Sequence, residues 1–354
     1  MKCSFTSLAH STKAPKGNEL SAVTISETAT RSSTPSSSSS IPPALVQVEP
    51  YANVTHVELF YWLLEGGEWA FEGEKRKMGR PHVLKHAFAH PFLLIELLAI
   101  SALHLSTRRP TQQAFYREEA TRLQSQALRL FNETMQDLNL SNIIPVFLFS
   151  ALQGIATFYE TFHAPTYETS DGALFENIVQ SVRLLQGVRS IVGSWWNFLC
   201  TSDIKDILDE DPTPNLEWSD EFVNQLETFR VHILQSTGLD QTQAAVCDNA
   251  IEELIWVYKS TFGNESEYPL TDQAAAKYAT QWLILIPQAY TELLVERKPE
   301  ALVILGHFAA VLHKLRGFWT VGDAGRQLLS VVEAHLEEPW HAAISWPKSF
   351  VEGD

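Results

Sequence analysis

The chain has 354 residues, 45% hydrophobic and 19% charged, which is the balance of a globular protein with a sizeable core. Its formal net charge of −16 disfavours direct contact between the folded body and the phosphates of nucleic acids. The three cysteines, Cys3, Cys200 and Cys247, are odd in number and far apart. They indicate reduced thiols in an intracellular compartment and exclude a disulfide framework as the basis of the fold.

Residues 1–47 are rich in serine, threonine and proline, and they carry too few apolar side chains to offset the entropy cost of ordering. The sequence therefore predicts a disordered arm over residues 1–47. Residues 48–350 are predicted to form one all-α domain, a single large helical bundle.

Apolar side chains recur every three or four residues over most of this region, which is typical of helices, and strand signals are weak. The acidic segment Asp209–Pro214 is interpreted as a loop within the domain. Helices are predicted at Val54–Glu65, Pro91–Leu105, Gln113–Leu138, Ile143–Phe162, Gly172–Ser190, Asp220–Ser236, Thr242–Thr261, Thr271–Glu296, Pro299–Leu315 and Ala324–Leu336.

Two kinds of helix are expected. Pro91–Leu105 is apolar on nearly all sides and should be buried, whereas Gln113–Leu138 has one apolar stripe. The polar residues beside that stripe are expected to face water; they are Arg117, Glu118, Arg122 and Glu133. No membrane insertion is expected, because Glu96 interrupts the best apolar run, Phe92–Leu105, and the run is short for a bilayer.

His82, His86 and His90 have the four-residue spacing of metal ligands on a helix. Pro91 biases His90 away from helical geometry, and no cysteine or carboxylate stands nearby in the sequence as a fourth ligand. The chain also lacks G-x-S-x-G, G-x-G-x-x-G and G-x-x-x-x-G-K patterns. The sequence therefore predicts no metal site, no cofactor and no catalytic residues, and the chain is not expected to be an enzyme.

The segment Pro299–Pro347 holds two amphipathic helices joined by a turn of aromatic residues and glycine. Its aromatic side chains are either ordinary core or the wall of a pocket for a lipid-like ligand, because such pockets are mainly apolar and aromatic. We take the second interpretation as a hypothesis, with the candidate lining residues Phe308, Leu312, Phe318, Trp319, Gly322 and Trp340.

Four motifs occur in the same order as in a known family. They are HPFLLIELLAISALHL at His90–Leu105, the spaced Tyr, Ala, Gln, Ala-Leu and Phe of Tyr116–Phe131, LLQGVRSI at Leu184–Ile191, and the tryptophan-bearing segment Pro299–Pro347. In this respect the chain resembles fungal binuclear zinc-cluster transcription factors related to the sterol uptake control protein. The resemblance covers most of residues 50–350.

The resemblance implies a transcription regulator that acts in the nucleus, or in both cytoplasm and nucleus, with an all-helical domain that binds an apolar, sterol-like molecule. In that family a cluster of six cysteines binds zinc and DNA, whereas here Cys3 alone lies upstream of residue 200. We therefore expect DNA contact only indirectly or through a missing zinc cluster. A lost exon, a natural truncation and a new role all remain open.

Two other functions fit the same helices. The chain could be an interaction module that forms a homodimer or a heterodimer with a full-length factor, since helix-on-helix contacts need no special residues. It could also be an enzyme of a fungal biosynthetic cluster that uses an apolar helical cavity to orient its substrate, a role in secondary metabolism.

Overall fold

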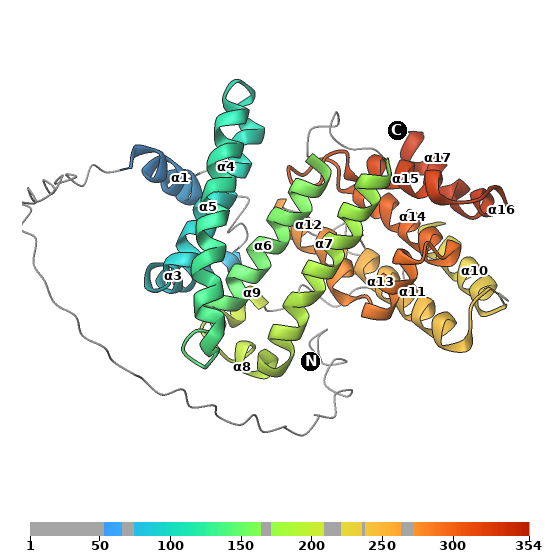
Figure 1. The fold of residues 1–354 in the computed structure, drawn as a ribbon, viewed down its shortest axis with the longest axis horizontal. Coiled ribbons are helices and arrows are strands. Elements are labelled where there is room, and N and C mark those ends of the chain that lie inside the picture. The colour runs from blue at the N-terminus through green and yellow to red at the C-terminus, as the bar shows by residue number, and fades with distance from the viewer. Residues whose placement is uncertain are drawn as a thin grey trace, which may run out of the picture.

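The computed structural model of the chain describes residues 53–65, 74–163, 171–208, 221–235, 238–262 and 272–353. Helices account for nearly all of these residues, and none of them is in a strand, so the predicted all-α bundle is confirmed. Helices α1 and α3–α5 lie at one end, α6 and α7 run through the middle, and α10–α17 lie at the other end (Figure 1). The predicted arm, residues 1–47, lies outside the described residues.

Most of the long helices begin and end within a few residues of the predicted positions. They are α1 (Val54–Glu65), α4 (Pro91–Arg108), α5 (Gln113–Thr134), α6 (Ile143–His163), α7 (Asp171–Val192), α10 (Glu221–Gln235), α11 (Gln241–Phe262), α14 (Pro299–Lys314) and α15 (Ala324–His335). The sequence did not predict α3 (Glu74–Ala89), which has Pro81 in its interior, or the short helices α8 (Trp196–Leu199), α9 (Lys205–Leu208), α16 (Glu338–His341) and α17 (Ser345–Glu352). Its acidic loop, Asp209–Pro214, lies outside the described residues.

The prediction of a single helix over Thr271–Glu296 is wrong. The structure has two helices there, α12 (Asp272–Leu285) and α13 (Gln288–Val295), with Pro287 as the residue before α13. Proline has no amide hydrogen to donate, and it disfavours the helical conformation in the residue before it, here Ile286. The chain therefore changes direction at this point.

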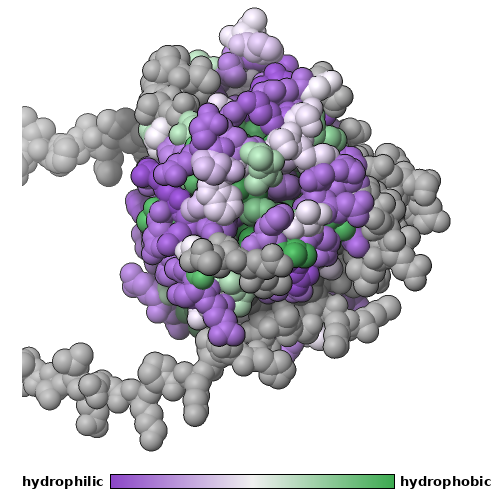
Figure 2. Space-filling model, turned by 90° about the vertical axis from the view of Figure 1, so that its right-hand side faces the viewer, coloured by the Kyte–Doolittle hydropathy of each residue, from purple (hydrophilic) through white to green (hydrophobic). Residues whose placement is uncertain are grey.

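Two clusters of buried apolar side chains make up the core. The N-terminal cluster is built from α1, α3, α4, α5 and α6 together with Leu199 and Ile204. The C-terminal cluster is built from α6, α7 and α10–α15 together with Ile344 and Val351. Helix α6 contributes to both, because Tyr159 belongs to the first cluster while Phe158 and Phe162 belong to the second. Figure 2 shows the outer surface at the C-terminal end, which is mostly hydrophilic.

Each cluster is organised around one helix that is buried almost throughout. In α4 all but a few residues are buried, and in α14 every residue from Glu300 to His313 is buried. Both helices begin with a proline, Pro91 and Pro299, at a position where the missing amide hydrogen costs nothing. A helix that is apolar on all sides needs neighbours on all sides, so α4 and α14 fix the positions of the helices that cover them.

By length and composition alone, α4 and α6 are apolar enough to cross a membrane. In the fold, 72% of the α4 window and 61% of the α6 window are buried inside the protein. Core helices of water-soluble proteins pass the same test, so these two helices give weak evidence for a membrane span. The helix at Pro91 runs to Arg108, three residues beyond the predicted end, and its buried residues include Glu96.

The contact between α14 and α15 is close enough to require glycine at position 325. A Cβ atom at Gly325 would lie 2.5 Å from His313 N and 2.6 Å from Ala309 O, both backbone atoms of α14. Because backbone atoms cannot move aside as a side chain can, any larger residue must push the two helices apart.

We expect Gly325→Ala to lower the free energy of unfolding by about 1–3 kcal/mol through overpacking. The control is Gly187→Ala in α7, where a Cβ atom would meet nothing within 4 Å. That variant should gain roughly 0.5–1 kcal/mol from helix propensity. Urea unfolding followed by circular dichroism measures both. A Gly325→Ala protein as stable as the wild type would contradict the close packing.

Candidate functional site

Trp319 links the two hydrophobic clusters. It lies in the turn between α14 and α15, yet it packs against the N-terminal cluster, where its ring is 5.0 Å from the ring of His104 and 5.4 Å from that of Tyr159. Two of the sequence motifs, one in α4 and one in the C-terminal segment, thus meet at this residue. The turn after α14 is therefore in direct contact with α4 and α6.

His104 is held uncharged under Trp319. The indole Nε1–H of Trp62 in α1 donates to His104 Nδ1 at 3.1 Å, so this nitrogen is an acceptor. Burial, and secondly the positive charge of Arg108, lowers the pKa of His104 to about 4. At neutral pH the imidazole is therefore neutral and serves as a packing surface for Trp319.

Gly322 and His163 form the other side of the same junction. Gly322 has a φ of +49°, a conformation that favours glycine, and a Cβ atom there would lie 3.0 Å from His163 Nε2. His163 Nδ1–H donates to the carbonyl oxygen of Tyr159 at 2.9 Å, and the His163 ring stacks on the Tyr159 ring at 4.2 Å. The turn after α14 can approach α6 this closely because position 322 has no side chain.

The structure brings two of the six predicted lining residues together, Trp319 and Gly322, around Tyr159 and His163. The other four, Phe308, Leu312, Phe318 and Trp340, pack in or against the C-terminal cluster. The Phe308 ring lies 4.5 Å from that of the buried Trp282. The role of the six residues in binding an apolar ligand stays a prediction.

The histidines with helical spacing have structural partners. Helix α3 ends at Ala89, and His90 has extended backbone angles, φ −131° and ψ 97°, as expected from Pro91. His86 Nε2 lies 3.0 Å from Asp203 Oδ1, and His82 Nδ1 lies 3.6 Å from Asp203 Oδ2. Within the part of the chain that the structure describes, no group of three His, Cys, Asp or Glu side chains could hold a metal ion. Sequence reasoning missed Asp203, which is far from these histidines in the chain.

Glu96 was expected to interrupt an apolar run, and the structure places it wholly inside the protein, with 0% of its side chain exposed. Neither of its carboxylate oxygens has a hydrogen-bond partner among the described residues. Burial, and secondly the negative charge of Glu160, raises the pKa of Glu96 from 4.5 to about 8. Glu96 is therefore mainly protonated at neutral pH.

Glu96 makes stability depend on pH in a defined direction. Its pKa is 4.5 in the unfolded chain and about 8 in the folded protein, so folding takes up a proton between these values. The folded state is favoured by this group at low pH, and the contribution is lost as the pH rises from 4.5 towards 8.

We expect Glu96→Gln to raise the free energy of unfolding by about 3 kcal/mol at pH 7, with almost no gain near pH 4.5. The control is Glu118→Gln, which removes a carboxylate from the exposed face of α5 and should change stability by less than about 0.5 kcal/mol. Urea unfolding at several pH values measures the difference. A gain that is the same at every pH would contradict a buried, protonated Glu96.

Comparison with known proteins gives two matches. Residues 71–210, the range that contains α3 to α9, match the family described as "Fungal specific transcription factor domain". A Zn(2)-C6 fungal-type transcription factor of Gibberella zeae is 25% identical over an alignment of 277 residues, and the alignment covers 72% of this chain and 52% of that protein. The chain thus spans about half the length of this relative. No solved structure gives a significant match.

Proposed function

We propose, from the fungal specific transcription factor domain that residues 71–210 carry, that this chain of the fungal zinc-cluster regulatory family regulates transcription and catalyses no reaction. The match to that domain is the observation that carries the proposal. The relative is nearly twice as long as the matched part of this chain, so DNA contact is assigned to a zinc cluster outside the helical domain or in a partner.

The helical domain is proposed to pass a signal from its C-terminal helices to the matched domain. His104 and Tyr159 lie within residues 71–210, and Trp319 contacts both from the turn after α14. A ligand or partner that moves this turn would change the packing of α4 and α6. The same turn is fixed in place by Gly322 against His163.

The signal is proposed to be an apolar, sterol-like molecule bound beside this turn. Phe318, Trp319 and Trp340 are half-buried, so their rings are the members of the predicted lining set nearest the surface. Phe308 and Leu312 are buried on α14, in the cluster against which Phe318 and Trp340 pack. Pockets for such ligands are mostly apolar and aromatic, with few polar groups.

The chain is proposed to act in the nucleus as a homodimer or as a heterodimer with a related factor, and to be held in the cytoplasm when its ligand is bound. The net charge of −16 supports an indirect contact with DNA, because an acidic body is repelled by phosphate. A partner that carries a zinc cluster would supply that contact.

The transcription role predicts that the chain changes the output of a promoter to which it is brought. We expect a fusion of the full chain to a heterologous DNA-binding domain to change expression of a reporter gene at least several-fold, either up or down. The DNA-binding domain alone is the matched control. Equal reporter expression from the fusion and the control, with both proteins present at equal amounts, would refute the role.

If the ligand is apolar and sterol-like, a fluorescent sterol should bind saturably to the purified chain. We expect Trp319→Phe and Phe318→Leu to weaken binding about 5- to 100-fold, because each removes part of a desolvated aromatic wall. The control Phe115→Leu changes an aromatic residue that is half-exposed on α5 and should leave binding unchanged. Absence of saturable binding, or equal affinity of all four proteins, would rule out this pocket.

A further inference from the structure

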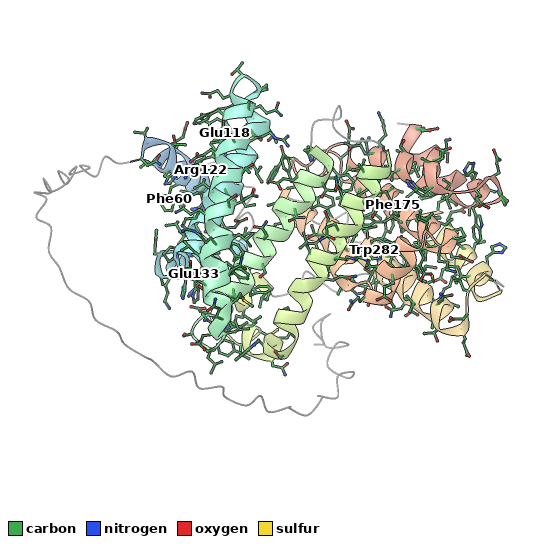
Figure 3. All side chains as sticks on the ribbon, viewed as in Figure 1. Phe60, Glu118, Arg122, Glu133, Phe175 and Trp282 are labelled. Carbon is green, nitrogen blue, oxygen red and sulfur yellow. The ribbon has the colours of Figure 1, made fainter. Side chains whose placement is uncertain are left out.

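A pocket of about 310 Å³ lies between α5 and α6. Helix α4 contributes Leu103, and α5 and α6 supply a mostly polar set of side chains. The lining residues are Leu103, Arg117, Thr121, Gln124, Ser125, Leu128, Gln153 and Glu160. Figure 3 shows the labelled Glu118, Arg122 and Glu133 along α5, and these three are exposed as predicted. Arg117 is the exception, because it is half-buried in the pocket.

Arg117 and Glu160 bring opposite charges into the pocket without pairing with each other. Arg117 Nη1 donates to the carbonyl oxygen of His163 at 2.7 Å, and the guanidinium lies 6.0 Å from the centre of the Tyr159 ring. Among the described residues no ion pair joins Arg117 to Glu160 within 4 Å. A ligand with one group of each sign would meet both residues.

The neutral side chains of the pocket present hydrogen-bond acceptors to a ligand. Thr121 Oγ1 donates to Arg117 O at 3.0 Å, and Ser125 Oγ donates to Thr121 O at 2.8 Å. Each hydroxyl donates its single hydrogen to a backbone carbonyl of its own helix. In this arrangement its oxygen is an acceptor for a ligand. Gln153 Oε1 is buried and has no hydrogen-bond partner among the described residues.

Gln124 joins the two ends of the pocket. Its side chain is only 8% exposed, and its Nε2, a donor, has no hydrogen-bond partner among the described residues. Burial raises the pKa of the Glu160 carboxyl, and Gln124 and Arg117 act in the opposite direction. The charged end therefore consists of Arg117, Gln124 and Glu160. Ser125, Leu128 and Gln153 form the other end, further along both helices.

We infer that this pocket binds a small α-amino acid whose side chain carries N–H donors. The ammonium group meets Glu160, the carboxylate meets Arg117, and the side-chain N–H groups reach Ser125 and Gln153 while the methylene groups contact Leu103 and Leu128. A charged group left unpaired in a half-buried site is costly, so a ligand that supplies both counter-charges is favoured over one that supplies either alone. This inference goes beyond the proposed transcription role and does not depend on the apolar ligand.

The test is calorimetric titration of the full chain with L-glutamine as the probe. Three related compounds each lack one feature: γ-aminobutyramide has no carboxylate, glutaramate has no ammonium group, and L-norvaline has no side-chain N–H. We expect saturable binding of glutamine, and affinities at least about 10-fold lower for each of the other three, because each loses a charge-assisted or buried hydrogen bond.

Protein variants assign the binding to this pocket. We expect Glu160→Gln and Arg117→Gln to weaken glutamine binding at least about 10-fold, and Gln153→Leu to weaken it several-fold. The matched controls Glu118→Gln and Arg129→Gln remove the same charges from exposed positions of α5 and should bind as the wild type does. Circular dichroism and thermal unfolding establish that each variant is folded; if Arg117→Gln is not, Glu160→Gln and Gln153→Leu carry the test.

Three results would overturn the inference. The first is no saturable binding up to about 10 mM glutamine, a concentration above the Kd of a weak small-ligand site. The second is equal binding of glutamine and any of the three related compounds. The third is unchanged affinity in Glu160→Gln. None of these results bears on the reporter experiment, so the transcription role and the amino-acid site are tested separately.

Discussion

Successive side chains of α6 belong to two different hydrophobic clusters, and the arrangement of the other helices depends on this division. Phe158 and Phe162 face the C-terminal cluster, whereas Tyr159 faces the N-terminal cluster. A helix used on two sides in this way cannot shift without disturbing both clusters, because protein interiors are close-packed. Trp319 adds a second connection from the C-terminal side, and it ends on the same Tyr159 ring. The two hydrophobic clusters are therefore joined by direct packing at α6 and at Trp319.

The helices that could be predicted from the sequence are those whose ends and apolar faces are set by residues within the helix itself. The periodic apolar residues of α5, and the prolines that begin α4 and α14, give their positions within a few residues. The break at Pro287 was also visible in the sequence, and it was overlooked because apolar spacing continues across it. Helix α3 was missed for a different reason: Pro81 lies inside it and its ends carry no apolar stripe that would have identified it.

The surroundings of the residues at the two candidate sites could not be predicted, because they are made by distant parts of the chain. Arg117 has the sequence position of a solvent-facing residue, and only the approach of α6 gives it half-buried surroundings. Asp203 reaches His86 from more than a hundred positions along the chain. Trp319 and Gly322 are predicted lining residues because of their position in the C-terminal segment, but the sequence could not indicate that both would meet α6.

The complete burial of α14 has a consequence for how the protein is made. Helices α15 and α17 pack against α14 and follow it in the sequence, so they leave the ribosome after it. Until they arrive, one side of a helix with no polar face is open to water and to other nascent chains. A premature stop codon just after α14 would leave a polypeptide in which α15 and α17 are absent and one side of α14 stays uncovered.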